Sequence, residues 1–141
     1  DAADLARNLE HPRPEVEGRY SRADQLAREC GSPRQQVEVA YQWAWTLYYW
    51  CEDYHTFVDQ YQIVEERAKG SRNVYDVERL YTLWITLHWT IGRADLDPED
   101  ASFEVRTETL TAELTRLQNE EDRPSTALQA ETLLLEMQLA R

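Results

Sequence analysis

Two stretches of the chain decide its fold: VEVAYQWAWTLYYWCED at Val37–Asp53 and VERLYTLWITLHWTIGR at Val77–Arg93. Both are too long for a strand, and their apolar residues recur three and four positions apart, as on a helix. Aligned on their first residues, they share five identities in fifteen positions: Val37/Val77, Glu38/Glu78, Tyr41/Tyr81, Thr46/Thr86 and Leu47/Leu87. The second stretch is a fainter copy of the first, which predicts a repeated helical unit.

Glycine and proline are scarce in the chain, with four and five copies, and they stand where helices are expected to end. No alternating, turn-bounded strand pattern occurs. Asp97 and the Gly31-Ser32-Pro33 sequence mark predicted helix starts. The pattern predicts six to seven helices, at about residues 1–10, 14–30, 34–51, 54–69, 74–91, 98–120 and 125–141. Short loops make neighbours antiparallel, so we expect one domain, 1–141, with hairpins at 14–52, 54–92 and 97–141.

The unit resembles the tetratricopeptide repeat. Its entry motif, Gly-x-Tyr-x-x-Ala, is matched by Gly18–Ala23 (GRYSRA), and packing positions of its first helix match Tyr41, Ala44, Trp45 and Tyr48. The match covers about residues 16–141, with departures at Glu52, in place of glycine, and Phe57, in place of alanine. The resemblance implies an all-α, right-handed stack of antiparallel helical hairpins.

Each copy has a second face beside its packing stripe, since residues three or four apart share one side of a helix. In the repeats it resembles, that face lines a concave groove that holds peptides. The resemblance therefore implies a set of partner-binding candidates: Gln42, Trp43, Thr46, Tyr49, Trp50, Arg79, Thr82, Thr86 and Trp89. The alternative is that these side chains fill the core between helical layers.

The formal net charge is −12, from 15 Lys and Arg against 27 Asp and Glu. This charge argues against nucleic acid as the partner, because phosphate contact needs a basic stripe. No apolar run is long enough to span a membrane. Cys30 and Cys51 have no disulfide or metal spacing, so we expect reduced thiols and a cytoplasmic protein. The chain starts with Asp1 and ends without a helix stop signal, so we expect a piece of a longer protein.

Candidate chemistry is weak. Glu52 and His55 have the Glu-x-x-His spacing of carboxylate-bridged metal sites, but the repeat-equivalent Gly92–Asp95 has no histidine and the segment falls at a predicted turn. We therefore favour a solvated turn with Asp53 as N-cap. No phosphate loop, hydrolase motif or dinucleotide fingerprint is present. We therefore expect no catalysis, no cofactor and no metal.

The resemblance thus implies a non-catalytic interaction module that binds a peptide or a partner helix. By analogy with the family alone, it would be the repeat segment of a larger signalling or regulatory protein, with other domains of the same parent chain as further partners. The acidic surface favours basic partners. Two alternatives stay open: a tryptophan-lined pocket for a small molecule, and an acidic mimic that binds a basic protein. The run Glu99–Asp122, with eight acidic residues, is either such a docking face or a solvated outer face.

Overall fold

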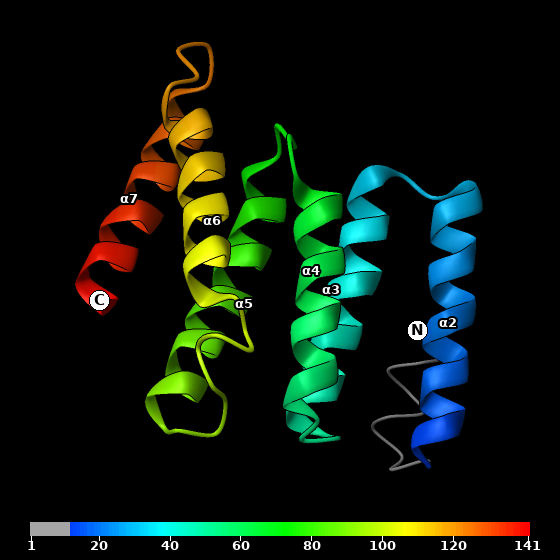
Figure 1. Cartoon of the computed structure of the whole chain (residues 1–141). Helices are drawn as coiled ribbons and strands as arrows, with labels where there is room; N and C mark the ends of the chain where they lie inside the picture. Colours follow the sequence, from blue (N-terminus) through cyan, green and yellow to red (C-terminus); the bar gives the residue numbers. More distant parts are fainter. Residues whose placement is uncertain (1–11) are drawn as a thin grey trace. The chain divides into compact units, whose positions relative to one another are not determined.

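The computed structural model describes residues 12–141, which form six α-helices and contain no strand (Figure 1). The helices are α2 (Arg13–Cys30), α3 (Pro33–Tyr49), α4 (Tyr54–Ala68), α5 (Val74–Gly92), α6 (Phe103–Gln118) and α7 (Pro124–Ala140). The prediction of an all-α fold is confirmed for these residues. The helix predicted at residues 1–10 lies outside the described part of the chain.

The chain forms two compact units, one ending at Arg67 and the next beginning at Ala68. In the first unit, α3 packs against α2. The Gln60 carboxamide of α4 donates to the Ala40 carbonyl oxygen of α3 (3.1 Å). Arg67 at the end of α4 forms an ion pair with Asp24 of α2. These contacts join all three helices of the unit. Their buried apolar side chains form its core: Val37, Ala40, Ala44, Leu47, Phe57, Tyr61 and Val64.

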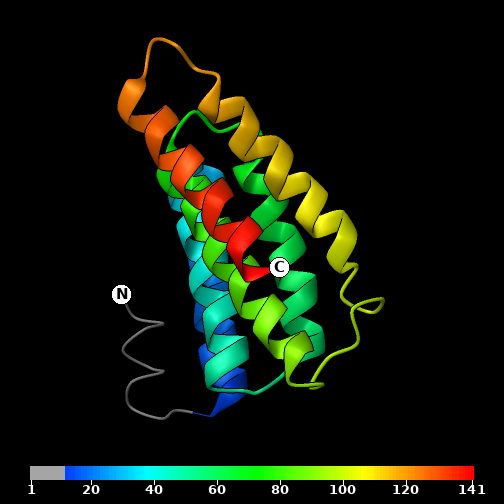
Figure 2. The same cartoon turned by 90° about the vertical axis from the view of Figure 1, so that its left-hand side faces the viewer.

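In the second unit, α5 packs against both α6 and α7, and α6 and α7 lie side by side in opposite directions (Figure 2). Trp84 of α5 is fully buried, and its indole N–H donates to the Thr107 hydroxyl of α6 (2.9 Å). The leucines of the unit's core are also completely buried: Leu80, Leu83, Leu87, Leu110, Leu114 and Leu117.

The start of α3 follows the local signal predicted for it. The Ser32 hydroxyl accepts from the Gln35 backbone N–H (3.3 Å), and the Gln35 carboxamide accepts from the Ser32 N–H (2.8 Å), forming a capping box. A Cβ on Gly31 would lie 2.6 Å from the Ala27 carbonyl oxygen, so only glycine fits this close turn.

The predicted start of α6 near Pro98 is wrong, because the helix begins at Phe103. Asp97 does cap a turn, accepting from the Glu99 N–H (2.8 Å), but that turn does not continue. Ser102 has a left-handed backbone (φ 50°), which a helix cannot contain. The break places Ala101 and Phe103 in the interior, so tertiary packing overrides the local helix signal.

Among residues 12–141, no helix combines the length and apolar character needed to cross a membrane.

Candidate functional site

The side of α3 that contains Trp43 and Thr46 packs against α2. The Trp43 ring lies 5.1 Å from the Tyr20 ring, measured between centroids. The buried Thr46 hydroxyl donates to the Gln42 carbonyl oxygen (2.9 Å) and shares a hydrogen bond with the Tyr20 hydroxyl (3.3 Å). Two of the predicted partner-binding residues therefore serve the contact between neighbouring helices.

A different side of α3 is partly open, with Tyr49 exposed and the other three residues half-buried, and we call it the α3 face: Glu38, Gln42, Trp45 and Tyr49. These positions are spaced by four, three and four residues, so they form one stripe along the helix. The Gln42 carboxamide donates to the Glu38 carboxylate (3.0 Å). The Trp45 and Tyr49 rings are stacked at 4.8 Å with 17° between their planes. The α3 face therefore has a polar, acidic beginning and an aromatic end.

Neighbouring aromatic rings of α3 support the aromatic end of the α3 face. Trp45 meets the Tyr41 ring edge-on at 5.8 Å, and Tyr48 meets the Tyr49 ring edge-on at 4.9 Å. Tyr48 in turn contacts Phe57, which is completely buried in α4. Tyr49 nevertheless stays 63% exposed. The pair therefore consists of supported rings of which one remains in contact with solvent, and tryptophan and tyrosine are residue types enriched at binding hot spots.

Of the nine predicted site residues, Gln42 and Tyr49 lie on the α3 face. Trp50 follows Tyr49 as the C-cap of α3 and is 52% exposed. Glu38 and Trp45 are not among the predicted residues. The repeat motif assigns Trp45 to the packing stripe and assigns Glu38 to neither stripe. The spacing from Glu38 to Gln42, Trp45 and Tyr49 was a usable signal for them.

The other predicted residues lie on α5, in the second unit. Trp89 is exposed and Thr82 and Arg79 are half-buried. Thr86 is buried, with its hydroxyl donating to the Thr82 carbonyl oxygen (2.8 Å). Thr86 therefore has no surface to offer a partner.

The stretch of α5 that corresponds to the α3 face is partly occupied by α7. Glu78, the counterpart of Glu38, accepts from the Gln129 carboxamide of α7 (3.3 Å). Beside this stretch, the hydroxyl of Tyr81, the counterpart of Tyr41, donates to the Glu136 carboxylate of α7, and burial together with this carboxylate raises the pKa of Tyr81 to about 12. The corresponding face is therefore less available on α5 than on α3.

A cleft of about 160 Å³ lies between α2, α3 and α4. Trp43 and Tyr20 form part of its aromatic wall, and Asp24, Gln60 and Arg67 supply polar groups. Arg67 is committed to Asp24 and also donates to the Gln36 carbonyl oxygen (3.0 Å). Sites for small molecules usually measure roughly 300–1,000 Å³, so the size of this cleft suits a single side chain better than a whole ligand.

The turn between α3 and α4 is built around Asp53. Its carboxylate accepts from the Thr56 hydroxyl (2.7 Å) and backbone N–H (3.1 Å), and it pairs with Arg13 (2.9 Å). The hydrogen bond from the Thr56 hydroxyl is the largest cause that lowers the pKa of Asp53, and Arg13 adds to it. The prediction of Asp53 as the N-cap of this helix is confirmed.

Cys51 lies beside this turn. Burial raises the pKa of the Cys51 thiol, although Arg13 opposes the shift. A raised pKa keeps the thiol protonated near neutral pH, which is the opposite of what a cysteine nucleophile needs. Within residues 12–141, no three or more His, Cys, Asp or Glu side chains are grouped to hold a metal ion.

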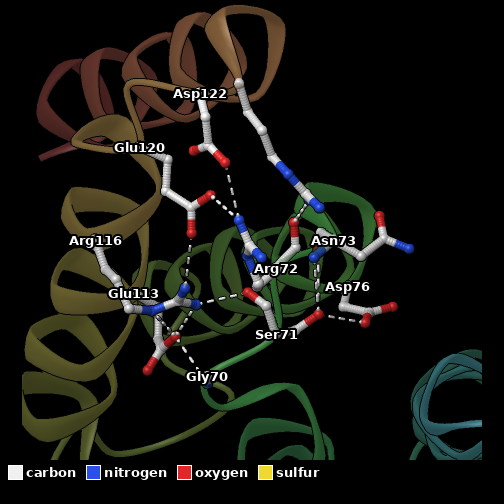
Figure 3. Close-up of polar contacts among 10 residues, drawn as sticks. Gly70, Ser71, Arg72, Asn73, Asp76, Glu113, Arg116, Glu120 and Asp122 are labelled. Atoms are coloured by element: carbon white, nitrogen blue, oxygen red, sulfur yellow. Dashed lines mark hydrogen bonds and ion pairs between the residues drawn. The ribbon is translucent and has the colours of Figure 1, made fainter.

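Part of the acidic run Glu99–Asp122 is used inside the second unit (Figure 3). The Arg116 guanidinium pairs with Glu113 (2.7 Å) and donates to the Ser71 carbonyl oxygen (2.7 Å). Arg72 pairs with Asp122 (3.2 Å) and with Glu120 (3.4 Å). These carboxylates anchor the loop before α5 to the end of α6, and the two arginines offset part of their charge.

Comparison of the chain with protein families, characterised proteins and solved structures finds no match. The candidate site therefore stands on the geometry of the α3 face.

Proposed function

We propose that this protein is a non-catalytic, tetratricopeptide-like repeat module that binds a basic peptide on the α3 face. The observation that carries the proposal is the stacked Trp45–Tyr49 pair, because Tyr49 is 63% exposed although its ring is supported by Tyr48. An isolated exposed aromatic residue is ordinary, whereas a pre-ordered pair loses little side-chain entropy on binding.

Burial supports the repeat. Val37 and Val77, Thr46 and Thr86, and Leu47 and Leu87 are buried pairs at the aligned positions. The hydroxyls of Thr46 and Thr86 both donate to the carbonyl oxygen four residues earlier. The aligned residues Tyr49 and Trp89 are exposed to similar extents, 63% and 59%. A right-handed stack of hairpins is the arrangement that we propose for such a repeat.

The chemistry of the partner follows from the charge of the face. Glu38 places a carboxylate one helical turn from Gln42, and the chain has a net charge of −12. A peptide with Lys or Arg beside an apolar or aromatic residue would complement both the acidic and the aromatic end of the α3 face. Its cations would pair with carboxylates and also lie over aromatic rings. Both cysteines are free thiols, which supports a reducing compartment such as the cytoplasm.

Selection from a random peptide library tests the proposal. The full chain is used as bait, beside a Trp45→Ala/Tyr49→Ala variant and a Tyr75→Ala control, in which an exposed tyrosine of α5 is removed. We expect peptides rich in Lys or Arg that bind the wild-type chain and the control alike and lose roughly tenfold or more affinity for the double variant. The proposal fails if no peptides are enriched, or if the enriched peptides bind the double variant equally well.

A further inference from the structure

Helix α7 has apolar residues on two opposite sides. Ala130, Leu133 and Met137 are buried on the side that packs within the second unit. Leu128, Leu135 and Leu139 are 65%, 54% and 86% exposed. We call these three residues the leucine stripe.

The leucine stripe is continuous along the helix. Its members are spaced by seven and four residues, which places them within about 40° of one another around the helix axis. The stripe is roughly 16 Å long at 1.5 Å per residue. Burying one leucine side chain contributes about 1.5–3 kcal/mol, so a partner that covered all three leucines would gain a large binding free energy. An apolar stripe of this spacing suits a second helix laid along it.

The charges along α7 select the kind of helix. Between Arg123 and Arg141 the chain contains two acidic residues, Glu131 and Glu136, and no basic residue. Both carboxylates are exposed at the edges of the leucine stripe. A second copy of α7 placed against the stripe would bring carboxylates toward carboxylates, which is unfavourable. A helix with lysine or arginine at its edges would be attracted.

We infer that the leucine stripe is a docking surface for an amphipathic helix with leucine-type residues on one side and lysine or arginine along its edges. Apolar contact supplies the affinity, and the edge charges choose the partner and disfavour self-association. This surface belongs to the second unit and uses none of the residues of the α3 face, so either proposal can fail without the other.

The test uses a fluorescent synthetic helical peptide with a leucine stripe and lysine edges, and a matched peptide in which glutamate replaces each lysine. Fluorescence anisotropy measures binding of each peptide to the full chain. The lysine peptide should bind roughly tenfold or more tightly than the glutamate peptide, and raising the salt concentration should reduce this difference.

Two variants locate the binding. Leu128→Gln/Leu139→Gln should weaken binding of the lysine peptide roughly tenfold or more. Leu26→Gln, at a leucine that is 56% exposed on α2 of the first unit, should leave binding unchanged. Circular dichroism should show the same helix content in all proteins, because each replaced side chain is exposed. Equal binding to the double variant, or equal affinity for the two peptides, would overturn the inference.

Sedimentation of the chain alone tests whether a second copy of the chain, and not a basic helix, covers the leucine stripe. A monomer is expected for both the wild-type chain and the double variant. A wild-type dimer that the double variant converts to monomers would show that a second copy covers the leucine stripe, which would overturn the choice of a basic helix.

Discussion

Helices α3 and α5 carry the same pattern, yet each has a tryptophan at a position where the other has an aliphatic residue. At the aligned positions 44 and 84, α3 has alanine and α5 has tryptophan, and both side chains are fully buried. The Trp84 ring packs against the rings of His88 and Phe103 at 5.6 and 5.7 Å, and these two rings are also 5.7 Å apart. At the next position, α3 has Trp45, which stacks on the exposed Tyr49, and α5 has Ile85. Trp84 therefore stabilises the interior on α5, whereas Trp45 supports an exposed ring on α3, so similar composition does not imply similar function.

The largest effect should come from removing the interior tryptophan. Trp84→Ala removes a completely buried ring and leaves the Thr107 hydroxyl without its indole donor, so the free energy of unfolding should fall by about 3–5 kcal/mol. Trp89→Ala is the matched control, since Trp89 is 59% exposed on the same helix and its loss should change stability by less than about 0.5 kcal/mol. Urea unfolding measures both. Equal losses would remove the distinction between inner and outer aromatics.

The next effect should come from enlarging the aligned small residue. Ala44→Leu adds three carbons at a site with no exposed surface, and overpacking should lower the free energy of unfolding by about 1–3 kcal/mol. Ala112→Leu, at an exposed position of α6, should have little effect. If Ala44→Leu were stabilising, α3 would have room for an interior aromatic residue. The placement of Trp45 at the partly exposed position would then need another cause.

The N-caps of α4 and α5 should respond differently to pH. Asp53→Ala removes a charged cap and should cost about 1 kcal/mol at neutral pH. Because the folded pKa of Asp53 is lowered, this contribution is fully present above the unfolded pKa of about 3.9 and is lost as the pH falls through the folded pKa. Asn73 caps α5 by accepting from the Tyr75 N–H (3.1 Å) and does not titrate.

Asn73→Ala is therefore the control for the pH dependence. Its cost, from the loss of an equivalent cap, should not follow the titration of a carboxylate between pH 7 and 3. Unfolding curves recorded across this range compare the two variants. An Asp53→Ala cost that stays constant from pH 7 to pH 3 would mean that the carboxylate contributes nothing through its charge.

Helix identity and most helix ends could be predicted from the sequence, because they depend on residues close in the chain. Ser32 and Gln35 are three positions apart, and Asp53 and Thr56 are also three apart. The start of α6 could not be predicted, because burial of Ala101 and Phe103 competes with the local signal of Asp97 and Pro98. A local pattern does not include the tertiary contacts that decide such a competition.

The candidate site was predicted only in part. The spacing rule found two stripes on α3, but it could not tell which stripe meets α2, since that depends on Tyr20, 23 residues before Trp43. The ion pair of Arg72 with Asp122 and the hydrogen bond from Arg116 to the Ser71 carbonyl oxygen join residues 50 and 45 positions apart, and they leave no pattern in the sequence. On α7, the buried and exposed apolar residues alternate around the helix and hide the leucine stripe from a search for one apolar face.

The most direct measurement is a calorimetric titration of a library-selected basic peptide into four proteins: the wild-type chain, Tyr49→Ala, Trp45→Ala and Trp89→Ala. The structure predicts that Tyr49→Ala and Trp45→Ala each lose roughly tenfold or more in affinity while Trp89→Ala binds as the wild type does. An unchanged affinity for Tyr49→Ala and Trp45→Ala, or an equal loss for Trp89→Ala, would contradict the assignment of the α3 face as the binding surface.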